Sequence, residues 1–468
     1  MAAISALKRG IRFRDLVLLY VVIVLSVRWT ATAAAAGPSI LVVWLAALFC
    51  FFIPLAACVM ELSSRHPEEG GIYVWTREAF GDFSGFICAW TYWMSNLPFF
   101  PGVLYFGAAS ALFAFGPRAQ GLAANPLYYM AFAIFWLAVI TLLNIRGVDA
   151  GKWLNNIGAV GSLTPLVILL VLAAVSYWRF GPANHIAAHD LAPHWSFNNA
   201  VFWSSVFFAF SAIESASAMG DEIQNPRRAI PWALLVAGAI LAVGYIGGTA
   251  ALVLALPAEA VGGPDGFVNG IRVLTARLGL GWMLAPVALL VALNAVGGAA
   301  GNLSSTARLP FVAGVDRYLP AAFGWIHPRY RTPWVAIAVY GSAGAVVALL
   351  GQAGTSVRGA YDVLVSMAVI SLFLPYLFLF GAMIRLQDRP AGPEVRRVPG
   401  GKPVAIALAS LGLASTAVTI VLSVIPSADE TNKPLAVAKV VGGTAVLVGL
   451  GVAVFVGSRI RARRVLDR

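Results

Sequence analysis

The chain of 468 residues is too apolar for a protein that water surrounds on all sides. Hydrophobic residues make up 60% of it and charged residues only 11%, whereas soluble globular domains carry about 25% charged residues. With a mean hydropathy of +0.83, this composition excludes a soluble enzyme and indicates that lipid is the solvent for most of the surface.

Twelve segments are long and apolar enough to cross a bilayer, which takes about 20 mostly apolar residues per helix. Because lipid offers no partner to backbone N–H and C=O groups, we expect each segment to be helical, and the fold to be an all-α polytopic membrane protein. The predicted spans are 16–36, 40–60, 83–115, 127–145, 153–178, 199–220, 231–256, 281–307, 333–350, 361–384, 403–425 and 440–457.

The basic residues predict the orientation of these spans. An even number of spans places both termini on one side, and most of the 32 Lys and Arg residues then share that side. By the positive-inside rule, both termini are cytoplasmic and the protein lies in the cell (inner) membrane. The net charge of +12 therefore indicates contact with anionic lipid headgroups, and no nucleic-acid recognition module accompanies it.

Two of the twelve spans contain residues that do not suit an uninterrupted membrane helix. The first holds Arg28, Trp29 and two threonines, and the sixth holds Glu214 about half-way along. A charge at mid-membrane costs roughly 2.5 to 3.5 kcal/mol on insertion scales, so it has to face a cavity, a partner or a proton. We therefore predict helix breaks near Thr30 and Ala212.

Breaks in the first and sixth helices are typical of an inverted repeat of five plus five helices. Unwound backbone is tolerated at this depth only where it lines a cavity. There the N-terminus of a half-helix suits a carboxylate, while free carbonyls and an acid such as Glu214 suit an ammonium group. The pattern thus predicts a site for a small zwitterion.

Motifs in both halves strengthen this interpretation. The segments 61–73, with a Pro-Glu-x-Gly-Gly turn, 208–217, 222–228, 308–320 and 326–329 resemble, in order, those of the amino acid–polyamine–organocation (APC) superfamily. The chain is most similar to its bacterial glutamate/GABA and arginine/agmatine antiporters. The resemblance implies two inverted five-helix repeats with two peripheral helices, alternating access, and a substrate between helices one, three, six and eight.

The predicted domain organisation follows the same scheme. Its units are a cytoplasmic tail (1–14), repeat one (15–178), an external loop (179–198), repeat two (199–385), two peripheral helices (386–458) and a basic cytoplasmic tail (459–468).

The resemblance also implies roles for single residues: Phe208 as an aromatic gate, Ser211 as a carbonyl donor, and Glu214 as the sixth-helix acid. Two family features are missing, the Gly-Ser-Gly-Ile-Phe break of the first helix and a lysine in the fifth. The predicted substrate-binding residues are Arg28, Trp29, Thr30, Ala31, Thr32, Ala33, Asn96, Phe208, Ser211, Ala212 and Glu214, and the predicted gate residues are Phe208, Glu214, Asp221, Glu222 and Arg227.

Several of these residues have two interpretations. Arg28 either recognises an anionic substrate group or neutralises Glu214 in an intramembrane pair. Asn96 either contacts substrate or joins helices by hydrogen bonds. Ser304 and Ser305 either serve a sodium ion or allow close packing, the second being favoured.

Together these features predict a secondary transporter of amino acids or related amines, working by exchange. The alternative is a proton- or sodium-coupled symporter of polyamines or another small organic solute.

No ATP-binding, dinucleotide or nucleophile motif is present, so we expect neither a cofactor nor enzymatic activity. A membrane enzyme is disfavoured because the histidines lie in loops, and a channel because no selectivity loop repeats. We do not expect a metal site. The histidines in question are His185, His189 and His194, and the cysteines, which lie in apolar runs, are Cys50, Cys58 and Cys88. Substrate identity and oligomeric state stay open.

Overall fold

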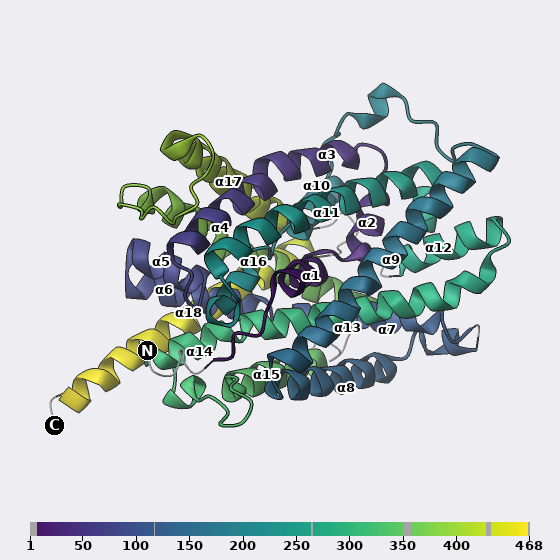
Figure 1. The fold of residues 1–468 in the computed structure, drawn as a ribbon. Helices are drawn as coiled ribbons and strands as arrows, with labels where there is room; N and C mark the ends of the chain where they lie inside the picture. The colour runs from purple at the N-terminus through teal and green to yellow at the C-terminus, as the bar shows by residue number, and fades with distance from the viewer. Residues whose placement is uncertain (1–6, 117, 264, 351–356, 427–431, 467–468) are drawn as a thin grey trace.

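The computed structural model describes residues 7–116, 118–263, 265–350, 357–426 and 432–466. Helices run side by side through the length of an elongated bundle, and both chain termini lie at the same end, which we call the terminal face (Figure 1). Within these ranges, the one β-type pairing is an isolated parallel bridge between Ile11 and Ile223. The predicted all-α fold is therefore confirmed.

The longer helices and their bounds are as follows. They are α1 (Phe13–Val24), α2 (Val27–Ala34), α3 (Ile40–Ala47), α4 (Ile53–Arg65), α5 (Ile72–Phe80), α6 (Asp82–Ser95), α7 (Phe99–Leu112), α8 (Pro126–Ile145), α9 (Val148–Phe180), α10 (Phe197–Ala209), α11 (Pro226–Ala255), α12 (Gly266–Arg277), α13 (Leu284–Thr306), α14 (Arg308–Val315), α15 (Trp334–Leu350), α16 (Val357–Leu386), α17 (Gly401–Val424) and α18 (Lys433–Leu466).

Short helical turns complete the chain. A π-helical turn, η2 (Leu48–Phe52), joins α3 to α4, and the 3₁₀ turns are η3 (Ala119–Leu122), η4 (Ala188–Leu191), η5 (Ser215–Glu222), η6 (Ala258–Ala260), η7 (Gly281–Met283) and η8 (Ala321–Gly324).

Eight helical segments of the described ranges are long and apolar enough to span a bilayer, and the shorter apolar helices Trp334–Leu350 and Ser371–Leu386 add to them. The count of twelve spans and the domain boundaries stay predictions. The predicted single span 83–115 is instead two helices, α6 and α7. Between them Pro98 has no N–H to donate, and the backbone tightens to bonds such as that from Phe99 N–H to Asn96 O (3.3 Å).

The first break exists, but it lies earlier than predicted. Leu25 and Ser26 are extended, with ψ of 92° and 116°, whereas Thr30 lies inside α2. The cause is Tyr245 of α11, whose hydroxyl donates to Val24 O and accepts from Ser26 N–H (3.2 Å). This hydroxyl gives the unwound backbone the partners that lipid cannot provide.

The second break lies where the sequence predicts it. After α10, the chain is irregular from Phe210 to Glu214 before η5 begins, and Ala212 has a φ of 69°, which is uncommon for a residue other than glycine. Ala212 N–H donates to the Tyr376 hydroxyl of α16 (2.7 Å). Each break is thus stabilised by a tyrosine from another helix.

Glycines bring the first half-helix against α9 and α13. A Cβ added at Gly158 of α9 would lie 2.6 Å from the Cα of Gly297 in α13 and 2.7 Å from Val22 of α1. Real Cβ atoms do not approach that closely, so only glycine permits these backbones to touch. The contact fixes α1 directly before its break.

Candidate substrate site and gates

Glu214 forms the centre of a buried polar cluster at the second break. The residue is 2% exposed, and its Oε1 accepts hydrogen bonds from the hydroxyls of Tyr92 in α6 (2.6 Å) and Tyr376 in α16 (3.0 Å). Its Oε2, and the hydroxyl of Tyr20 in α1, have no hydrogen-bond partner in the described structure. The cluster therefore has capacity for one more donor.

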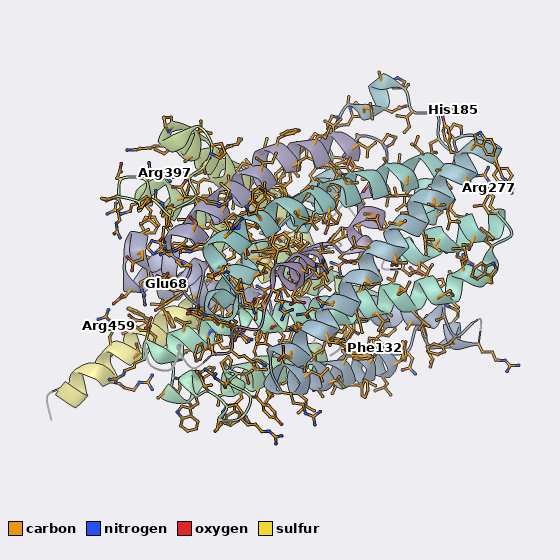
Figure 2. All side chains as sticks on the ribbon, viewed as in Figure 1. Glu68, Phe132, His185, Arg277, Arg397 and Arg459 are labelled. Atoms are coloured by element: carbon orange, nitrogen blue, oxygen red, sulfur yellow. The ribbon has the colours of Figure 1, made fainter. Side chains whose placement is uncertain are left out.

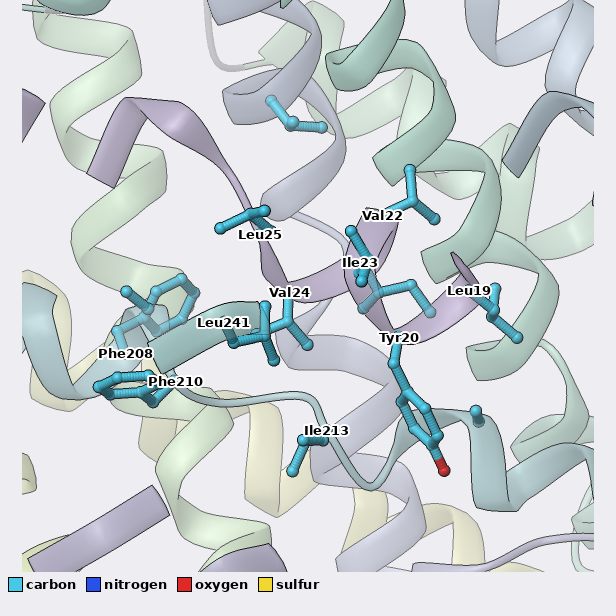
Figure 3. Packing of buried hydrophobic residues seen from close by; sticks show 14 of the residues in the cluster. Leu19, Tyr20, Val22, Ile23, Val24, Leu25, Phe208, Phe210, Ile213 and Leu241 are labelled. Atoms are coloured by element: carbon cyan, nitrogen blue, oxygen red, sulfur yellow. The ribbon is translucent and has the colours of Figure 1, made fainter. Parts of the chain in front are cut away.

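The two interrupted helices meet in this region. Figure 3 shows the labelled residues of α1, among them Tyr20 and Val24, in one packed cluster with Phe208 of α10 and with Phe210 and Ile213 of the second break. Further along, Trp29 at the start of α2 and Phe208 near the end of α10 make an edge contact, with ring centroids 5.3 Å apart. Phe208 and Trp29, both predicted at the site, are thus brought together.

Arg28, at the start of α2, is buried near the first break. Its guanidinium lies over the ring of Trp29, 4.0 Å from the centroid, and the residue is 4% exposed. The hydroxyls of Tyr92 and Tyr376 donate to Glu214. Both interpretations of Arg28, substrate recognition and pairing with Glu214, stay predictions.

The other predicted residues of the breaks are placed as follows. Thr30 donates its hydroxyl to Val27 O (2.6 Å), and Ser211 donates its hydroxyl to Phe208 O (2.6 Å). Ala31, Thr32 and Ala33 lie within helical α2 and not in unwound backbone. The backbone N–H groups nearest to the first break are those at the start of α2, which begins at Val27.

Asn96 lies in a buried chain of amides between helices. Its Nδ2 donates to Tyr92 O (2.8 Å), and its Oδ1 accepts from Nδ2 of Asn302 in α13 (2.7 Å). Tyr340 of α15 donates to Oδ1 of Asn302 (3.3 Å). Contact of Asn96 with substrate stays a prediction, and the structure shows both ends of its amide engaged.

The hydroxyls of the possible ion site, Ser304 and Ser305, also contact neighbouring protein groups. Ser305 donates its hydroxyl to the carbonyl of Gly301 in its own helix (3.1 Å), and the Ser304 hydroxyl lies 3.9 Å from the sulfur of Met219. Among the residues that the structure describes, no group of three His, Cys, Asp or Glu side chains is arranged to hold a metal.

A buried ionic cluster joins three segments near the terminal face, and we call Glu69, Asp221, Glu222 and Arg308 the inner cluster. The guanidinium Nη2 of Arg308 donates to both carboxylate oxygens of Glu222 (2.8 and 2.9 Å). Its Nε lies 3.8 Å from Oε1 of Glu69. Backbone N–H groups of Glu69 and Asp221 each donate to the other's carboxylate (3.1 Å).

Two predicted gate residues, Asp221 and Glu222, therefore belong to this cluster, and Arg227 does not. Arg227 forms an exposed ion pair with Glu394. The basic residue of the cluster is Arg308 and not the predicted Arg227. Arg308 begins α14 directly after α13, and its guanidinium donates to the carbonyl of Ser304.

Glycines of the Pro-Glu-Glu-Gly-Gly turn and of η5 permit this closure. A Cβ at Gly71 would lie 2.8 Å from Ser217 Oγ, and one at Gly220 would lie 2.0 Å from the carbonyl oxygen of Pro67. Gly70 N–H also donates to Ala218 O (3.0 Å). The turn is thus in direct backbone contact with η5.

Sequence reasoning missed the side chains that complete these sites. Glu69 and Arg308 lie in the family-like segments 61–73 and 308–320, but nothing in these segments assigns them a role. No local signal marks the tyrosines that pair with the two breaks. The missed residues are Tyr20, Glu69, Tyr92, Tyr245, Asn302, Arg308, Tyr340 and Tyr376.

A multi-pass membrane protein with two interrupted helices around a buried acid belongs among transport proteins, and the comparisons agree. A family model described as amino acid permease matches residues 11–447, so the chain belongs to this family of the APC superfamily.

Its relatives include several transporters. An uncharacterized transporter of Legionella pneumophila is 28% identical, with 90% of each chain covered. A probable agmatine/putrescine antiporter of Lactococcus lactis is 22% identical, with 85% of this chain and 84% of the relative covered. The serine/threonine exchanger SteT of Bacillus subtilis is 25% identical, with 78% and 80% covered.

Proposed function

We propose that the protein is a secondary exchanger of amino acids or related amines. The observation that carries this proposal is Glu214, a buried acid beside unwound backbone with one carboxylate oxygen that lacks a hydrogen-bond partner. A substrate ammonium supplies the missing donor there, and the first-turn N–H groups of α2 face the substrate carboxylate. Relatives named as antiporters and exchangers support exchange.

We infer that an aromatic contact closes one end of this site and that an ionic cluster closes the other. On one side, the rings of Trp29 and Phe208 touch; on the other, the inner cluster ties η5 to α14 through Arg308 and Glu222. We infer that alternating access opens one of these closures at a time, since each joins segments that flank the breaks. The energy then comes from the counter-gradient of a second substrate molecule.

We place the terminal face in the cytoplasm. Figure 2 labels Arg397 and Arg459 toward that end of the bundle, and His185 and Arg277 at the opposite end. The excess of basic residues in the loops and tails of the terminal face supports this orientation by the positive-inside rule.

Counterflow in proteoliposomes tests the proposal. Vesicles loaded with one unlabelled amino acid or amine are given the same radiolabelled compound outside, across a panel that includes serine, glutamate, arginine, agmatine and putrescine, with and without sodium or pH gradients. We expect uptake of at least one compound without sodium. Glu214→Gln removes the anionic partner and abolishes that uptake, while the exposed control Glu68→Gln does not. Full exchange by Glu214→Gln would refute the assigned role.

A further inference from the structure

The inner cluster contains three acidic side chains and one basic side chain, and most of it is buried. The side chains of Glu69 and Glu222 are fully buried, and that of Arg308 is 1% exposed. Half-buried Asp221 is the third carboxylate. With every group ionised, three negative charges would face a single guanidinium, and like charges at this proximity strongly disfavour full ionisation.

Arg308 divides its hydrogen bonds unequally between the two buried acids. Both oxygens of Glu222 receive hydrogen bonds from its Nη2, whereas Oε1 of Glu69 has no hydrogen-bond partner in the described structure and lies 3.8 Å from Nε of Arg308. That Nε also makes no hydrogen bond. Arg308 therefore compensates the charge of Glu222 more fully than that of Glu69, although burial also raises the pKa of the Glu222 carboxyl.

The surroundings raise the pKa of Glu69 well above its ordinary value. Burial is the largest cause, and the charge of Glu222 adds to it; Arg308 opposes both, Asp221 raises the pKa further, and the Asp221 N–H lowers it. These are the charged groups that face the Glu69 carboxyl. The next residue, Gly70, donates its N–H to Ala218 O (3.0 Å), so the turn that carries Glu69 is bonded to η5.

We propose that Glu69 is a proton-binding site of the inner cluster, protonated when this closure is shut and ionised when it opens. The proposal rests on the proposed alternating access and assigns the proton to a gate outside the substrate site. Because the closed state binds this proton more tightly than the open state, closure is favoured at low pH. It is lost as the pH rises through the raised pKa of Glu69.

Accessibility of a cysteine behind the cluster tests this without knowledge of the substrate. Cys50, Cys58 and Cys88 are replaced by alanine and Ser304, one turn above Arg308 and buried, by cysteine. The rate of maleimide labelling in detergent is measured over roughly pH 5 to 9. Dividing it by the rate for the same protein unfolded in SDS at each pH removes the titration of the thiol itself.

We expect the normalised rate to rise with pH, by up to about tenfold for each unit that separates the pKa of Glu69 in the closed and open states. Glu69→Gln mimics the protonated acid and should give a low, flat profile, while the neighbouring exposed Glu68→Gln should follow the parent. Glu222→Gln removes the like charge and frees Arg308, so it should move the midpoint to lower pH.

The outcomes separate this proposal from the transport assignment. A flat parent profile, a Glu69→Gln profile that still rises, or an unmoved midpoint in Glu222→Gln would each overturn the proton site. None of these depends on finding the substrate. Failure of counterflow would instead count against the proposed function and leave the labelling result as it stands.

Discussion

Replacement of Arg308 by methionine should be among the most destabilising substitutions in the bundle. The change keeps much of the side-chain volume but leaves Glu222 buried without the two hydrogen bonds of 2.8 and 2.9 Å that it receives. Breaking a buried pair from one side costs about 3 to 5 kcal/mol. The exposed pair of Arg459 and Asp82, whose side chains are 56% and 47% exposed, supplies a control. Such surface pairs contribute about 0.2 to 1 kcal/mol.

Equilibrium unfolding by SDS in mixed micelles measures both costs on the same scale. Arg308→Met should lower the free energy of unfolding several times more than Arg459→Met does. The double variant Arg308→Met/Glu222→Gln should recover at least about 1 kcal/mol, since the uncompensated charge is gone. If Arg308→Met costs no more than Arg459→Met, the inner cluster does not stabilise the closed protein and our reasoning about it is wrong.

Three further substitutions test other parts of the structure. Gly220→Ala places a Cβ 2.0 Å from the carbonyl oxygen of Pro67. It should therefore hold the inner cluster apart and speed labelling of the cysteine reporter at position 304. The control Gly449→Ala, whose Cβ has nothing within 4 Å, should leave the labelling rate unchanged. Tyr245→Phe removes the hydroxyl that serves two backbone groups at the first break and should cost about 1 to 3 kcal/mol in SDS unfolding, so an unchanged stability would contradict the account of that break. Asn302→Ala leaves two buried partners unpaired and should cost a similar amount; a neutral effect would show that this amide chain does not hold the helices.

Hydropathy was sufficient to predict the helical fold because lipid leaves the backbone no alternative. The second break was also predictable, since its cause is local: small residues and the buried acid Glu214 occupy the very segment that unwinds. The first break was misplaced because its cause is remote. Tyr245 lies 219 residues from Ser26 in the chain, and no pattern around Thr30 reveals which hydroxyl will replace the missing helical bonds.

The inner cluster illustrates a second limit. The sequence shows where charges occur but not which of them become buried. Arg227 lies in the first turn of α11, after the second break, and Arg308 begins α14, after the eighth predicted span. Arg227 lies at the surface beside Glu394, whereas Arg308 is enclosed with Glu222. Arg308 is enclosed where the glycine turn packs against η5, and that contact joins residues far apart in the sequence.

Glu222 is held by two contacts, one through its side chain and one through its backbone carbonyl, and they differ in how much they stabilise the closed state. Its side chain is held by Arg308, while its carbonyl accepts from Ile11 N–H (3.1 Å), which pairs the N-terminal segment with the end of η5. That segment is anchored by Lys8 and Asp149, whose side chains are about half exposed, so water readily replaces this ion pair. The buried pair of Glu222 and Arg308 should therefore contribute more to the cost of opening than the pair of Lys8 and Asp149. A proton on Glu69 would change the charge beside this attachment, because its carboxylate oxygen lies 3.8 Å from Nε of the same Arg308 and both side chains are buried.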